Sequence, residues 1–262
     1  MSVTISVPMD EERRAVGNYS VRELRAIVQG SAPNPEMETY TGRFCRLFSV
    51  YSTRFLLLTP LSPNQITVVS TVIAFLSFSV FFLDETYWWA APVLYFFSVV
   101  LDGSDGEVAR FRQQRGGYGG GYTEPVSHDF QYGFLFLIAG TALVYTHGFP
   151  TTVLLAAAIA ATSKLVLRGT QERFCNLRYA GTGQKQKELQ QVAFAKRPLL
   201  LRVFSRIERN IFSSTGILPI LLIFALLKRM DFFLYLYATG FFLLLFAHFL
   251  HQVRSLTKQS HS

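Results

Sequence analysis

Long apolar stretches alternate with short polar segments along most of the chain. A helix needs about 20 residues to cross the hydrocarbon layer of a membrane, which is about 30 Å thick. A soluble core would not need apolar runs of this length. The pattern therefore predicts an all-α, polytopic integral membrane protein with six transmembrane helices, at approximately residues 65–83, 87–108, 125–146, 151–172, 211–229 and 232–253.

The segment 40–59 has a different, amphipathic pattern. Its arginines, Arg43, Arg46 and Arg54, are interspersed with phenylalanine and leucine. This mixture predicts a helix that lies on the cytosolic membrane surface instead of crossing the membrane. The sequence thus divides into a polar cytosolic segment (1–39), a membrane domain (40–255) that opens with the interfacial helix, and a cytosolic tail (256–262).

Composition and charge agree with this membrane class. Half of the residues are hydrophobic, and 25 of the 262 are phenylalanine. The net charge of +8 could indicate a nucleic-acid partner. However, nearly all Lys and Arg lie in the termini and in the longer loops, and only Lys228 and Arg229 fall on the opposite side. Basic loops of this kind stay in the cytosol, so we expect both termini on the cytosolic side and no nucleic-acid partner.

The end of the second expected span is acidic. Asp102 and Asp105 are three residues apart, so they share one face of a helix. Two carboxylates near the membrane interior are unfavourable unless they are paired or bound to a cation. Their hard oxygen atoms suit Mg²⁺, Mn²⁺ or Ca²⁺. A simpler interpretation is that the two carboxylates neutralise Arg110 and Arg112 at the end of the helix.

A second polar group opens the third expected span. Glu124 and His128 are four residues apart, so they also share a helix face. Between them, Pro125 suits the first turn of a helix. A hairpin of the second and third spans would bring both residues to the depth of Asp102 and Asp105. For His128, a position at the helix end facing lipid head groups is the alternative.

These residues resemble the motif of the CDP-alcohol phosphatidyltransferases, D-x-x-D-G-x-x-A-R followed by G-x-x-x-D-x-x-x-D. The first half is matched by Asp102, Asp105, Gly106, Ala109 and Arg110. In the second half, which is in frame from Gly120, Glu124 takes the third acidic position and His128 the fourth. Nine residues instead of the usual eight separate the two halves. The segment 62–67 also resembles the S/T-P-N-x-x-T sequence that opens the first span in this family, and the resemblance covers roughly residues 40–255.

The resemblance implies a six-helix membrane enzyme, a homodimer, that uses Mg²⁺ or Mn²⁺. Such enzymes displace CMP from a CDP-linked donor, such as CDP-diacylglycerol or another CDP-alcohol, with the hydroxyl of an alcohol acceptor. By position, the implied metal ligands are Asp102, Asp105 and Glu124. The implied nucleotide site consists of Gly106, Ala109 and Arg110, with Asn64 and Thr67 from the first span.

His128 stands where the family has the base that deprotonates the acceptor hydroxyl. An imidazole is well suited to that work at neutral pH, and it could instead be a fourth metal ligand. Asp129 lies about 100° further around the helix and is the alternative base or a partner that orients His128.

Lys164 and Arg168 share a face at the end of the fourth span. An inward-facing cation at this depth is typical of a functional site. The pair could form an anion pocket for a donor or acceptor phosphate, or it could reach outward to the lipid head groups.

Three functions were compared with the sequence. The first is a CDP-alcohol phosphotransferase of a membrane lipid pathway. The second is a non-catalytic nucleotide- or lipid-binding scaffold with the same fold. The third, a cation transporter, fits the carboxylate pair but not its cytosolic depth.

Overall fold

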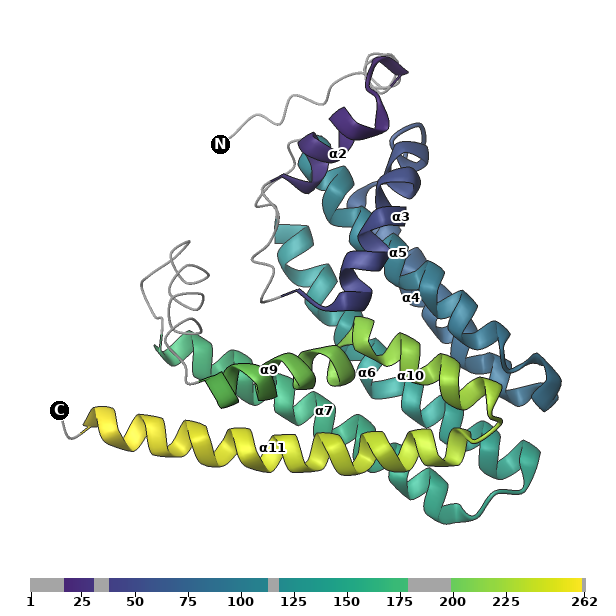
Figure 1. Cartoon of the computed structure of the whole chain (residues 1–262), viewed down its shortest axis with the longest axis vertical. Coiled ribbons are helices and arrows are strands. Elements are labelled where there is room, and N and C mark those ends of the chain that lie inside the picture. Colours follow the sequence, from purple (N-terminus) through teal and green to yellow (C-terminus); the bar gives the residue numbers. More distant parts are fainter. Residues whose placement is uncertain (1–16, 31–37, 113–117, 179–198, 261–262) are drawn as a thin grey trace.

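The computed structural model describes residues 17–30, 38–112, 118–178 and 199–260, and every regular element in these ranges is a helix (Figure 1). The all-α prediction is therefore confirmed. In chain order the α-helices are α2 (Val21–Gln29), α3 (Tyr40–Leu56), α4 (Pro63–Ser79), α5 (Ala90–Phe111), α6 (Tyr118–His147), α7 (Thr151–Arg178), α9 (Leu199–Phe212), α10 (Ser214–Leu226) and α11 (Met230–Ser260). Two 3₁₀ turns, η1 (Val80–Phe82) and η2 (Glu85–Tyr87), join α4 to α5.

Within the described ranges, three helical segments are long and apolar enough to cross a membrane: Pro63–Phe82, Thr151–Leu177 and Met230–Thr257. The bent pair α9–α10 makes a fourth if its two helices form one span. The membrane class is supported by these segments. Helices α5 and α6, which carry the polar motif, do not meet the same test, so the count of six spans stays a prediction.

The starts of α4 and α6 are formed in different ways, and the start of α6 differs from the sequence-based prediction. At α4, the Ser62 hydroxyl accepts from the Gln65 N–H and the Gln65 side chain accepts from the Ser62 N–H, with Pro63 in the first turn. This reciprocal cap fixes the helix start. Helix α6 instead begins at Tyr118, so Pro125 lies inside the helix and the prediction that it occupies the first turn was wrong.

Helix α3 is amphipathic, as its sequence pattern predicts. One face is buried against α5 and includes Cys45, Ser49, Val50, Thr53 and Leu56. The opposite face exposes large apolar side chains, among them Phe44, Leu47, Phe48, Tyr51 and Phe55. An exposed apolar face suits a membrane surface, and the interfacial location itself stays a prediction.

The predicted span 211–229 is interrupted. Helices α9 and α10 meet at a 62° bend, and the Ser213 hydroxyl caps α10 by accepting from the Gly216 N–H at 3.0 Å. A bend of this kind leaves backbone carbonyls without helical partners. Tyr237 and Lys164, from other helices, donate to the carbonyls of Ile211 and Phe212 at the end of α9. Tyr95 of α5 donates to the Ser214 carbonyl in the first turn of α10.

The helices pack around one aromatic-rich core. Helix α4 packs along α5 and α6, and α7 packs along α6 and α11 (Figure 1). The largest fully buried side chains of this core include Trp88, Tyr95, Phe136, Phe233 and Phe241. A smaller apolar cluster joins α2, α3 and the end of α5. The motif of α5 therefore lies between α3, α4 and α6, which supply its polar neighbours.

Candidate active site

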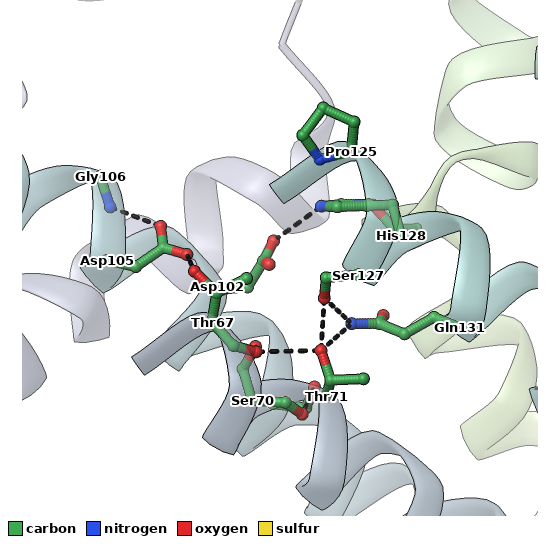
Figure 2. A network of polar contacts seen from close by, with 12 residues as sticks. Thr67, Ser70, Thr71, Asp102, Asp105, Gly106, Pro125, Ser127, His128 and Gln131 are labelled. Carbon is green, nitrogen blue, oxygen red and sulfur yellow. Dashed lines mark hydrogen bonds and ion pairs between the residues drawn. The ribbon is translucent and has the colours of Figure 1, made fainter. Parts of the chain in front are cut away.

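Asp102 and His128 face each other across α5 and α6 (Figure 2). His128 Nε2 lies 3.4 Å from Asp102 Oδ2. The other oxygen of this carboxylate, Oδ1, is buried and has no hydrogen-bond partner among the described residues. A buried carboxylate oxygen without a partner is unfavourable, so this atom is available to bind a ligand.

Asp105 is buried one turn further along α5. Thr67 Oγ1 of α4 lies 2.5 Å from Asp105 Oδ2 and also contacts the Pro63 carbonyl at 3.1 Å. The Gly106 N–H also donates to Asp105 Oδ1. Thr67, which the motif resemblance assigned to the nucleotide site, is thus a direct partner of the second motif carboxylate.

A group of hydroxyl and amide side chains lies beneath the two carboxylates (Figure 2). Thr71 of α4 and Ser127 of α6 share a hydrogen bond, and the amide of Gln131 lies 3.5 Å from both. Sequence reasoning missed these three residues. Their signal was available, since Thr71 follows Thr67 by one helical turn and Gln131 follows Ser127 by one.

Glu124 and Asp129 precede and follow His128 on α6. Glu124 is exposed on α6. Asp129 Oδ1 lies 3.1 Å from Arg168 Nε of α7. Among the described residues no three His, Cys, Asp or Glu side chains are close enough together to hold a metal ion. The structure therefore pairs Asp102 with His128 and buries Asp105 one turn away on α5, while Glu124 interacts electrostatically with Asp105 and with His128.

The glycine of the motif has a steric role that involves Arg110. A Cβ atom at Gly106 would lie 3.2 Å from Arg110 Nη1, closer than ordinary van der Waals contact. A glycine here lets the Arg110 side chain run back along α5. The Arg110 Nε–H donates to the Val28 carbonyl of α2, so α2 contacts the motif arginine directly.

Glu107, which the sequence analysis did not single out, is almost fully buried within the motif, with 1% of its surface exposed. Its carboxylate accepts from Ser49 at 2.6 Å, from Thr53 at 2.7 Å and from Gln29 at 3.0 Å. These donors come from α3 and α2. Glu107 therefore fixes both N-terminal helices to the helix that carries Asp102 and Asp105.

Lys164 and Arg168 both turn toward the protein. Lys164 Nζ donates to the Phe212 carbonyl at 2.8 Å and lies over the rings of Tyr132 and Phe241, 4.6 and 4.8 Å from their centroids. Cations over aromatic rings are stabilised in this way. Arg168 pairs with Asp129 and donates to the Pro125 carbonyl at 3.3 Å.

The carboxylate oxygens of Asp102 and Asp105 are suitable ligands for Mg²⁺ or Mn²⁺. Both are carboxylates, which these hard cations prefer, and Asp102 Oδ1 is buried with no hydrogen-bond partner in the described ranges. The two remaining nucleotide-site predictions lie nearby: Asn64 is in the first turn of α4 and Ala109 is one residue before Arg110, and both are half-buried.

A sequence profile described as CDP-alcohol phosphatidyltransferase matches residues 60–245, well over half of the chain. The chain belongs to the CDP-alcohol phosphatidyltransferase family. This family consists of membrane transferases of phospholipid biosynthesis that transfer a phosphate-linked group from a CDP-alcohol. A comparison with curated proteins found no match. The matched region of the phosphatidyltransferase fold begins just before α4, so α2 and α3 lie outside it.

Proposed function

We propose that the protein catalyses metal-dependent transfer of a substituted phosphate group from a CDP-linked donor to the hydroxyl of an alcohol, with release of CMP. The observation that carries this proposal is the state of Asp102. One of its oxygens faces His128 at 3.4 Å, and the other is buried and has no hydrogen-bond partner among the described residues, within the first half of the family motif.

In the proposed reaction the acceptor oxygen attacks the donor phosphorus that is proximal to the non-nucleotide group. A new bond forms between that oxygen and phosphorus, and the bond from phosphorus to the CMP oxygen breaks. The acceptor proton passes to a base, which we assign to His128. If Nε2 of His128 donates to Asp102, the other ring nitrogen is left as the proton acceptor. Asp102 then orients the imidazole, as carboxylates commonly do.

Asp102 and Asp105 would hold Mg²⁺ or Mn²⁺ through their carboxylates, and Glu124 would join them by moving toward α5. A divalent ion bound there would neutralise charge on the donor pyrophosphate. Asp102 can serve this ion and His128 at once because Oδ2 faces His128 while Oδ1 is left for the ion. The nucleotide would lie against Gly106, Ala109, Arg110 and, from α4, Asn64.

The proposed orientation has both termini and the site in the cytosol, and the proposed assembly is a homodimer. Basic residues concentrated in the longer loops and the termini support this orientation. Cysteine labelling at residue 20 and residue 187 should report the cytosol, and labelling at Thr86 and His147 the opposite side. Labelling of residues 20 and 187 from opposite sides would contradict the orientation.

CMP release by the purified full-length protein tests the activity. The protein would be incubated with Mg²⁺, CDP-diacylglycerol or another CDP-alcohol, and a mixture of polyols, and the lipid products identified by mass spectrometry. Asp102→Asn and Asp105→Asn should each abolish CMP release while the protein remains folded, because amides are poor ligands for Mg²⁺. Near-native activity in both variants would exclude the site.

The second candidate function is a non-catalytic nucleotide- or lipid-binding scaffold. It is favoured by the two departures from the family motif, Glu124 and His128, together with the exposed position of Glu124. A scaffold would bind a CDP-alcohol without releasing CMP under any of these conditions.

A further inference from the structure

Helices α2 and α3 border an open surface pocket whose lining does not include Asp102 or His128. It has a volume of about 320 Å³, and the described residues that line it are Arg22, Arg25, Ala26, Gln29, Gly30 and Arg46. We refer to it as the arginine cavity. Three of these residues carry guanidinium groups and none is acidic, so the lining has a concentrated positive charge.

The positive charge of the arginine cavity is only partly neutralised. Arg46 Nη1 pairs with Glu38 at 3.1 Å. Arg22 and Arg25 form no ion pair with a described residue. Arg25 Nη2 donates to the Leu47 carbonyl at 3.3 Å, whereas Arg25 Nε is buried without a hydrogen-bond partner among the described residues. A buried donor without a partner is unfavourable, and an anion in the cavity would supply the missing acceptors.

We propose that the arginine cavity binds a phosphate group. Guanidinium groups present paired N–H donors that match phosphate oxygens, and several of them around one cavity are typical of phosphate recognition. The phosphate could belong to an anionic lipid headgroup or to free phosphate. The neighbouring face of α3 exposes Phe44, Leu47 and Phe48, which suits the membrane surface where headgroup phosphates are found.

The arginine cavity is connected to the motif helix. Gln29, which lines it, donates to Glu107 of α5 and to the Arg46 carbonyl, at 3.0 and 2.9 Å. The next contact along α2 is from Arg110 to the Val28 carbonyl. A bound phosphate would hold α2 and α3 together at the place where both contact α5. The proposed site therefore fixes elements that the family match does not include.

Helix α2 itself is well defined at its start, which favours a formed site. Ser20 and Glu23 form a capping box, with the Ser20 N–H donating to Glu23 Oε2 at 2.8 Å. These hydrogen bonds from Ser20 hold the pKa of Glu23 below its usual range. At neutral pH the Glu23 carboxylate therefore accepts the cap hydrogen bonds at the start of α2, and Gln29 lies at the other end of this helix.

The test measures binding, so its result is independent of CMP release. Full-length protein in detergent micelles would be titrated with short-chain phosphatidic acid, with phosphatidylcholine and with sodium phosphate. Native mass spectrometry would count retained lipid, and the midpoint of thermal unfolding would report phosphate. We expect retention of phosphatidic acid over phosphatidylcholine, or a rise in the midpoint with phosphate alone. The first result identifies a headgroup and the second a free anion.

The variant Arg22→Gln/Arg25→Gln should weaken binding of the effective ligand by at least about tenfold, because two charged hydrogen-bond donors are lost. Arg22→Gln alone changes an exposed side chain and should weaken ligand binding severalfold. This single variant tests the proposal if the double variant does not fold. Arg54→Gln makes the same charge change on α3 outside the cavity lining and should bind as the wild type does. Equal binding by wild type and Arg22→Gln/Arg25→Gln, or no binding of either ligand by wild type, would overturn the proposal.

Discussion

Thr67 donates a hydrogen bond of 2.5 Å to the buried carboxylate of Asp105, although 38 residues separate the two in the sequence. The contact links the first turns of α4 to the motif on α5. Thr67 lies at the last position of the S/T-P-N-x-x-T segment. This gives that segment a physical role, which is to orient the second carboxylate of the motif.

Replacement of Thr67 by valine should therefore reduce activity without changing the shape of the side chain. Loss of a hydrogen bond to a metal-binding carboxylate commonly costs about 10–100-fold in metal affinity or activity. We expect Thr67→Val to raise the Mg²⁺ concentration needed for half-maximal CMP release. Thr67→Ser keeps the hydroxyl and should need a Mg²⁺ concentration close to that of wild type. The matched control is Thr162→Val, since Thr162 is exposed and donates only within its own helix. A Thr67→Val enzyme with unchanged Mg²⁺ dependence would show that the contact does not orient a ligand.

Glu124 tests whether the third motif acid takes part in the site. Aspartate is the family's usual residue there, so Glu124→Asp should keep measurable activity and Glu124→Gln should lose most of it. The reason is that an amide keeps the shape but not the charge needed by a hard cation. CMP release at several Mg²⁺ concentrations measures both variants, with Glu85→Gln, in the turn η2 between α4 and α5, as the control. If both Glu124 variants retained full activity, the residue would be removed from the ligand set.

Lys164 connects the bend between α9 and α10 to the rest of the bundle. Lys164→Met keeps the apolar stem but leaves the Phe212 carbonyl without its donor. A buried carbonyl left unpaired costs about 1–3 kcal/mol, so we expect a lower midpoint of thermal unfolding. Tyr237→Phe removes the donor to the neighbouring Ile211 carbonyl and should lower the midpoint in the same way.

The kinetics of Lys164→Met separate this structural role from an anion pocket. If Lys164 only supports the bend, the KM values for donor and acceptor should stay within about twofold of wild type at a temperature where the variant is folded. A tenfold rise in the KM of a phosphate-bearing acceptor, with no loss of thermal stability, would instead favour the anion pocket, at about 1.4 kcal/mol of lost binding free energy.

Hydropathy and motif spacing were sufficient to predict the helical class and the family. They predicted a common depth for Asp102 and His128, but not that the two side chains face each other at 3.4 Å. They could not predict the bend at Ser213. Residues 211–229 are as apolar as an unbroken span, and the donors to the carbonyls beside the bend, Tyr95, Lys164 and Tyr237, are distant in the sequence.

The same limit applies to Glu107 and Arg110. A motif position marked x carries no pattern of its own, yet Glu107 is the acceptor that fixes α2 and α3 to α5. Helix α2 lies near the motif because of contacts such as that from Arg110 to the Val28 carbonyl, 82 residues away. Long-range contacts to backbone atoms leave no periodic signal in a sequence, so only the folded chain reveals them.

The last prediction concerns His128, where the sequence departs from the family motif and where the structure places Asp102 Oδ2 at 3.4 Å. If His128 is the base, it must be unprotonated to accept the hydroxyl proton. The rate of CMP release should then rise with pH through the titration of an imidazole and level off above it. His128→Ala should lower the rate by about 10²–10⁴-fold, and His128→Asp should recover part of it, with the pH profile moved toward acid. If His128 is a metal ligand, His128→Ala should instead weaken metal affinity, and a higher Mn²⁺ concentration should restore the rate. Asp129→Asn is measured beside it, because Asp129 is the alternative base and pairs with Arg168 at 3.1 Å. A His128→Ala enzyme with the rate, metal dependence and pH profile of wild type would exclude both roles and would make Asp129 the base to test.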